Sequence, residues 1–158
     1  MLKNTILDPE PDILIKKLSL KEHKKILSNI KYFWITKSPI MRPLHHAVFS
    51  LLFSDFSFVL YKNSQIVSYV YAAYNGNKGF IHIIATRAGL YRKKYASVLL
   101  YHLEKAAREK KLKSIWAYCL SDNFQSRSFF EKNQFIMQKE IDISTDEKRI
   151  LFKKVINH

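Results

Sequence analysis

Three basic residues, Arg92, Lys93 and Lys94, stand directly before a segment whose apolar residues recur at helical spacing. This order predicts a helix that begins just after a cationic loop. The first N–H groups of a helix lack backbone partners and point along a dipole that favours negative charge, so they can bind phosphate. A solvated basic turn in front of a surface helix explains the same residues without a ligand.

The histidine and cysteine content gives no sign of metal or disulfide chemistry. Cys119 is the one cysteine of the 158-residue chain, which excludes an internal disulfide and a cysteine-rich zinc site. The six histidines form no H-E-x-x-H arrangement. We therefore predict no metal ion and interpret Cys119 as a small buried thiol.

The chain is strongly basic, with 27 Lys and Arg against 13 Asp and Glu and a formal net charge of +14. Such a positive charge attracts nucleic acid, an anionic surface or a phosphate-rich cofactor. A basic surface that is simply solvated would explain the charge equally well. No apolar run approaches the roughly 20 residues of a membrane span, and the N-terminus lacks the apolar stretch of a secretory signal. We expect one domain over residues 1–158, in the cytoplasm and without membrane contact.

The elements that must position these residues follow from periodicity and turn residues. Ser19 and Glu22 form a capping-box pattern at the start of the first helix. In the helix at 94–111, helical spacing places Glu104 on the solvent face. Helices are expected at 19–30, 43–53, 94–111 and 123–132, and strands at 12–18, 56–61, 66–74, 80–86, 113–120, 135–143 and 149–155. The order β-α-α-β-β-β-α-β-α-β-β predicts an α+β fold with a mixed, mostly antiparallel sheet flanked by helices.

Two segments add sequence motifs to this order. In residues 81–100, Tyr91, Lys94 and Ala96 fall on the pattern Q/R-x-x-G-x-G/A of a strand, phosphate loop and helix start. Residues 123–135 follow N-x-x-A/S-x-x-F-Y-e-k-x-G-F. The matching positions are Asn123, Ser126, Phe129, Glu131, Lys132 and Phe135. The order and both motifs resemble the GNAT superfamily of N-acetyltransferases, from about Asp12 to Val155.

The chain departs from the family pattern at its glycines and at one tyrosine. Its three glycines are at positions 76, 79 and 89, so the phosphate loop has none at its two pattern positions. Phe130 replaces the Tyr of F-Y, and Gln134 replaces the Gly of G-F. Lys94 can offer its amide to phosphate if its φ is negative and its side chain swings outward.

The resemblance implies acetyl-coenzyme A as the acetyl donor. Its pyrophosphate would lie on the loop at 92–97, and its pantetheine arm would pair with the backbone of residues 84–86. Asn123 would bond the arm or the phosphates, and it also fits a helix N-cap. The implied cofactor-binding residues are Ile84, Ala85, Thr86, Tyr91, Arg92, Lys93, Lys94, Tyr95, Ala96, Ser97, Asn123, Ser126 and Phe130.

The resemblance also directs attention to proton transfer. Some members carry a Glu where this chain has Phe80, and strand alternation would put Phe80, His82 and Ile84 on one face. His82 is therefore the leading general base, although a hydrogen-bonded strand histidine explains it equally. Phe130 lacks the hydroxyl of the usual acid, so Tyr118 is a substitute donor or a packing residue. The oxyanion donor is expected among the backbone N–H groups of residues 84–86.

The acceptor is expected to be a primary amine of a small molecule or protein. The residues assigned to its pocket are Tyr32, Trp34, His45 and His46, whose aromatic and basic character suits an uncrowded or partly anionic amine. A GNAT-like domain that binds coenzyme A or a partner without catalysis is the alternative. A basic nucleic-acid-binding module ranks last because the chain shows no nucleic-acid fold signature. The sequence leaves a homodimer open.

Overall fold

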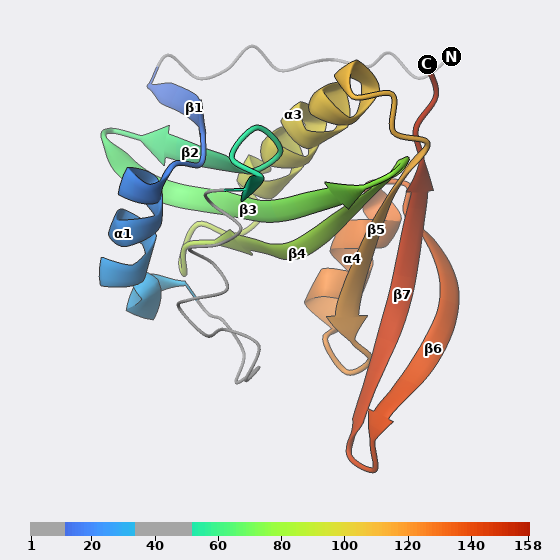
Figure 1. Cartoon of the computed structure of the whole chain (residues 1–158). Helices are drawn as coiled ribbons and strands as arrows, with labels where there is room; N and C mark the ends of the chain where they lie inside the picture. Colours follow the sequence, from blue (N-terminus) through green and yellow to red (C-terminus); the bar gives the residue numbers. More distant parts are fainter. Residues whose placement is uncertain (1–11, 34–51) are drawn as a thin grey trace, which may run out of the picture.

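The computed structural model describes residues 12–33 and 52–158, with Tyr32 described by its backbone alone (Figure 1). Seven strands of this part form one sheet in the order β1-β2-β3-β4-β5-β7-β6. Only β4 and β5 run parallel; every other neighbouring pair is antiparallel. The strands are β1 (Ile13–Lys17), β2 (Phe58–Lys62), β3 (Gln65–Asn75), β4 (Lys78–Thr86), β5 (Ser114–Leu120), β6 (Ile136–Ser144) and β7 (Glu147–Val155). The predicted mixed, mostly antiparallel α+β fold is confirmed.

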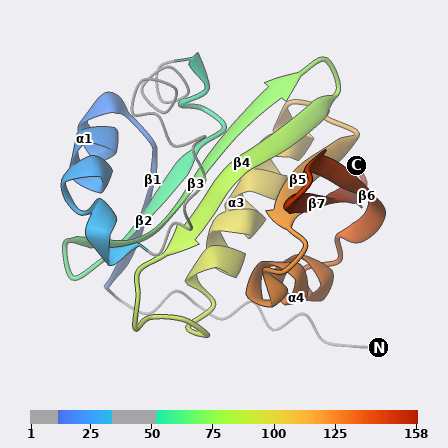
Figure 2. The same cartoon turned by 90° about the horizontal axis from the view of Figure 1, so that it is seen from below.

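Helices lie on both faces of the sheet (Figures 1 and 2). The helices are α1 (Leu20–Ser28), the short 3-10 helix η1 (Ile30–Tyr32), α3 (Tyr95–Glu109) and α4 (Phe124–Lys132). The core on one face contains Leu99 and Leu103 of α3 and Phe130 of α4. The core on the other face contains Ile26 of α1. Of the helix predicted at 43–53, all but the last two residues lie outside the described part.

The start of α1 differs in detail from the predicted capping box. Ser19 is the N-cap, but its hydroxyl donates to the Glu22 carboxylate and caps no backbone N–H. Burial raises the pKa of Glu22, but the hydrogen bonds from the Ser19 hydroxyl and from the backbone of Glu22 and Ser19, together with the charge of Lys16, lower it by more, so the pKa lies below its usual value. The two side chains therefore bind each other across the first turn of α1.

The prediction that Glu104 lies on the solvent face of α3 is wrong. Glu104 is only 9% exposed, because the Lys154 ammonium of β7 reaches it at 2.6 Å and Arg108 at 3.7 Å. A partner fifty residues along the chain thus converts a surface position into a buried, paired one. Such pairing is what makes a buried carboxylate tolerable.

Strand β4 does not alternate regularly. Ala72 of β3 pairs with Ile81 and Tyr71 pairs with Ile83, so His82 is an extra residue at a bulge. The bulge inverts the facing of the strand: Ile81 packs into the core beneath α3, whereas Ile83 packs on the α1 side. Ile84 returns to the α3 side. The expectation that Phe80, His82 and Ile84 share one face is therefore wrong.

Helix α4 ends in a left-handed residue that is not glycine. The Phe135 N–H bonds to the Phe130 carbonyl at 2.9 Å, and the Gln134 N–H bonds to the Glu131 carbonyl at 3.0 Å. This is the Schellman pattern, which usually places glycine at the residue with positive φ. Gln134 has φ +67. Helix α3 ends the same way, with Lys111 at φ +56.

Candidate cofactor site and open sheet face

A cavity of about 1000 Å³ opens where β4 ends and where α3 and α4 begin. All thirteen residues assigned to the cofactor from sequence line it. The lining also includes positions without an earlier assignment: Ala88, Leu90, Leu120, Asp122, Gln125, Phe129 and Lys132. Phe129 and Lys132 match the second motif, and the other five are neighbours of motif residues without a motif match of their own.

The loop before α3 keeps a glycine-like backbone without glycine. Lys94 is the N-cap of α3 with φ +62, and Arg92 has φ +65. The condition of a negative φ at Lys94 is therefore not met: this lysine adopts the left-handed conformation that glycine adopts without steric cost. Both side chains are exposed, and the first turn of α3 holds no acidic residue. The helix N-terminus thus opens on the cavity with its cationic surroundings intact.

The end of β4 offers backbone groups to the cavity. Strand β5 pairs with β4 only as far as Ile81, which faces Ala117. The Arg87 N–H points toward β3, where it bonds to the Val67 carbonyl at 2.8 Å. Because backbone groups alternate in direction along a strand, those of residues 84 and 86 point toward the gap left by β5. A peptide-like ligand could pair with them.

The start of α4 forms the facing wall of the cavity. Asn123 caps the helix by accepting the Ser126 N–H at 3.0 Å. Phe130 is 3% exposed and stacks on Phe152, with ring centroids 5.5 Å apart. Phe130 lines the cavity but brings no group that could donate a proton.

The proposed proton-transfer residues lie away from this cavity lining. His82 is exposed at the bulge, yet the surrounding protein desolvates its ring enough to lower its pKa. Tyr118 on β5 is 49% exposed. Cys119 is 8% exposed, and burial raises its thiol pKa to about 11. Such a thiol is a poor nucleophile at neutral pH.

Tyr118 lies on what we call the open face: the side of β4, β5, β7 and β6 opposite α3 and α4. Ile115, Ala117 and Cys119 pack into the core beneath the helices, so Trp116 and Tyr118 point the other way. No described helix covers this part of the face (Figures 1 and 2). Three acceptor residues expected from sequence, Trp34, His45 and His46, lie outside the described residues, and Tyr32 is described only as part of η1.

The sequence matches the model of the Acetyltransferase (GNAT) family over residues 27–135. The chain belongs to this family. As a GNAT acetyltransferase it is an enzyme that transfers acetyl from acetyl-coenzyme A to an amine. No curated protein matches the sequence.

Solved structures share the GNAT fold at low identity. The ribosomal-protein-S18-alanine N-acetyltransferase of Escherichia coli matches with TM-score 0.77 and 15% identity, over 92% of this chain and 95% of that one. Ard1 of Thermoplasma volcanium gives 0.78 and 14%, over 93% and 99%. The PaiA N-acetyltransferase of Thermoplasma acidophilum, solved in complex with coenzyme A, gives 0.70 and 19%, over 90% and 98%.

Two further features bear on the surroundings of this GNAT domain. In the described ranges, no helix is long and apolar enough to cross a membrane. The same part of the chain holds no cluster of His, Cys, Asp or Glu that could bind a metal ion.

Proposed function

We propose that acetyl-coenzyme A occupies the cavity with its pyrophosphate at the N-terminus of α3. The N–H groups of the first turn and the charges of Arg92, Lys93 and Lys94 bind the phosphates. The pantetheine arm pairs with the backbone of residues 84–86, and Asn123 holds the arm from the other side. The observation that carries this placement is the meeting, in one cavity, of an uncapped helix N-terminus and a strand end that β5 has left.

The bound thioester supplies an activated acetyl group. The Ile84 N–H donates a hydrogen bond to the carbonyl oxygen as negative charge develops there. His82 takes the proton that the acceptor nitrogen loses as its bond to the acetyl carbon forms and the carbon–sulfur bond breaks. Tyr118 returns a proton to the departing sulfur. Partial burial suits His82 to this role, because a lowered pKa keeps the imidazole neutral near pH 7.

The acceptor is a primary amine of a small molecule or protein that reaches the thioester from the open face. One structural neighbour is named for acetylating an alanine of a ribosomal protein, which favours a protein acceptor. Tyr32, Trp34, His45 and His46 complete the acceptor pocket in this proposal. We further propose that residues 1–158 form one catalytic domain that works in the cytoplasm. Light scattering would show whether this domain forms the homodimer that the sequence leaves open.

Ligand-induced stabilisation tests the cofactor site. Acetyl-coenzyme A at millimolar concentration should raise the melting temperature, because a ligand that binds only the folded state stabilises it. No shift would contradict the proposed cavity. A panel of amines with thiol release as readout then tests catalysis. Cofactor binding without release across a broad panel would favour the non-catalytic alternative.

A further inference from the structure

A tryptophan and two lysines meet on the open face near the start of β4. Trp116 pairs across the sheet with Phe80 of β4 and Lys153 of β7. The ammonium of Lys153 lies 5.3 Å from the indole centroid, and that of Lys78 lies 5.7 Å from it. The indole N–H donates to the Ser114 hydroxyl at 2.9 Å, which fixes the ring. Two cations from different strands therefore converge on one oriented aromatic ring.

The packing of Gly79 shows which face these β4 residues occupy. A Cβ at Gly79 would lie 2.9 Å from the Phe56 ring and 3.4 Å from Leu112, both in the core beneath α3. Its neighbours Lys78 and Phe80 must point to the opposite side. The Trp116 cluster is therefore on the open face, upstream of the bulge at His82.

Lys78 and Lys153 have no acidic counterpart among the residues that the structure describes. Within residues 12–33 and 52–158, no carboxylate lies within ion-pair distance of Lys78 or Lys153. Each ammonium is attracted by the ring, but the two repel each other. An anion bound between them would be attracted by both charges and would relieve that repulsion.

The cluster stands at a defined distance from the reacting centre. At about 3.3 Å per residue, Lys78 lies roughly 13 Å along β4 from His82 and roughly 20 Å from Ile84. An extended peptide spans about the same length per residue. A peptide whose amine lies at the thioester would therefore bring its fourth to sixth following residue to the lysines. A small metabolite could not reach both places.

We propose, building on the acetyltransferase function above, that the acceptor is a peptide segment with acidic side chains four to six residues after its reactive amine. The segment lies extended on the open face, with its carboxylates between Lys78 and Lys153 and its backbone over Phe80 and Trp116. The amine reaches the thioester beside His82. The Trp116 cluster thus selects the protein acceptor, and the cavity supplies the acetyl group.

The test measures kcat/KM for three peptides that share their first three residues. One carries two glutamates at positions five and six, one carries glutamines there, and one carries the glutamates at positions eleven and twelve. The first should be preferred about tenfold over both others, and the preference should shrink with added salt. Lys153→Gln should reduce the preference about threefold. The double variant Lys78→Glu/Lys153→Glu should reverse it in favour of a peptide with lysines at five and six.

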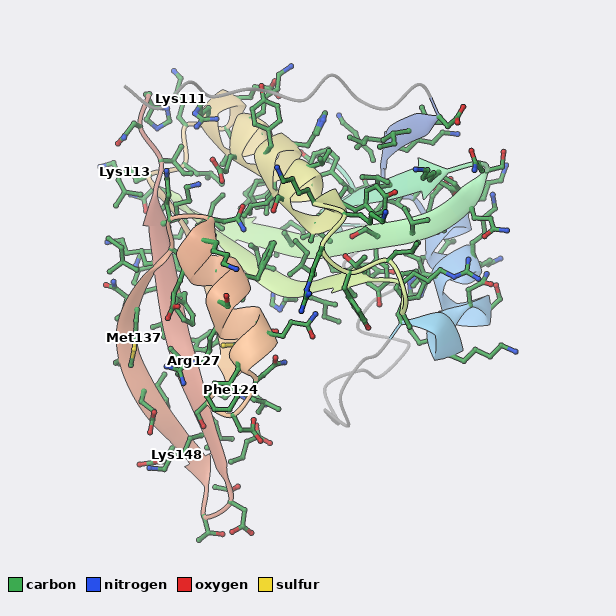
Figure 3. All side chains as sticks on the ribbon, turned by 180° about the vertical axis from the view of Figure 1, so that it is seen from behind. Lys111, Lys113, Phe124, Arg127, Met137 and Lys148 are labelled. Atoms are coloured by element: carbon green, nitrogen blue, oxygen red, sulfur yellow. The ribbon has the colours of Figure 1, made fainter. Side chains whose placement is uncertain are left out.

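Lys148→Gln is the matched control. Lys148 lies on the same strand as Lys153 but on the other face, where Figure 3 shows it beside β6, and it pairs with Glu140 at 3.4 Å. This variant should keep the tenfold preference. Equal rates for all three peptides with the wild-type enzyme would overturn the inference while leaving the acetyltransferase assignment standing. Absence of thiol release with every amine and peptide would instead remove the proposed function.

Discussion

Asn123 accepts the backbone N–H of Ser126 at 3.0 Å, and both residues line the cavity between α3 and α4. One side chain therefore starts a helix and borders the proposed cofactor at the same time. These two roles can be separated by substitution. The helix cap needs only a side-chain oxygen that accepts the Ser126 N–H, whereas the anionic cofactor would be repelled by a negatively charged side chain at position 123.

Asn123→Ala should lower the free energy of unfolding by about 1 kcal/mol through loss of the cap. Asn123→Asp should keep the cap and the stability, but it should weaken coenzyme A binding several-fold because its carboxylate faces the phosphates or the arm. Urea unfolding and calorimetric titration measure the two effects. Unchanged coenzyme A affinity in the aspartate variant would show that Asn123 serves the helix alone.

Gln134→Gly should stabilise the protein by about 0.5–1 kcal/mol. The substitution relieves a left-handed residue with a Cβ, and the gain is reduced by the greater chain entropy of glycine when unfolded. Lys111→Gly should act in the same direction. Lys105→Gly, in the interior of α3, is the opposite control and should cost about 1 kcal/mol. A loss of stability in the Gln134 variant would contradict the strain argument.

His82→Ala should lower kcat about a hundredfold without weakening coenzyme A binding. A general base works in its neutral form, and the pKa of His82 is lowered by burial. Protonation of His82 should therefore lower activity with a midpoint below pH 6.5, the ordinary value for histidine. The variant should lose this acid limb, and added imidazole should restore part of the rate. Wild-type turnover in the variant would move the base elsewhere.

Phe130→Tyr should raise kcat several-fold, because it places a hydroxyl on the cavity wall where the family motif has one. Phe129→Tyr, on the neighbouring lining position, is the control and should give no gain. The pre-steady-state rate of thiol release is the measurement. If Phe130→Tyr gives no gain while Tyr118→Phe slows release, Tyr118 alone returns the proton.

His23 should make folding sensitive to acid. It is 2% exposed, its Nδ1 lies 2.6 Å from the Tyr71 hydroxyl, and burial lowers its pKa. The unfolded chain then binds more protons below about pH 6.5, so stability falls as the pH drops through that value. Urea unfolding at pH 7.5 and pH 5 should show a smaller difference for His23→Gln. An equal difference would assign the acid sensitivity to other groups.

Local patterns predicted much of this molecule. Helical spacing located α3, and the residues of the second motif located α4 with Asn123 at its cap. The strands expected at 66–74 and 80–86 correspond to β3 and β4, and Gly76, with φ +55, lies in the turn between them. Each of these signals lies in one short, continuous segment of the chain, and over such a range the sequence dictates backbone shape most directly.

Features that depend on distant contacts were missed. Glu104 gave no sign of its pairing with Lys154, and nothing in residues 78–86 marks His82 as an extra residue against β3. The sequence also left the φ of Lys94 undecided, and the structure shows it to be left-handed. In that loop the surrounding structure fixes the backbone dihedral angles, and Lys94 adopts a positive φ that is strained for a residue with a Cβ atom.

The extra residue His82 shifts the inward–outward alternation of β4 by one position along the numbering. Before it, even-numbered positions look outward from α3; after it, odd-numbered ones do. Deletion of His82 would make Ile81 and Ile83 neighbours, and they would keep their opposite faces against Ala72 and Tyr71 of β3. Insertion or deletion at any other position of β4 would instead shift the remaining residues of the strand to the wrong face.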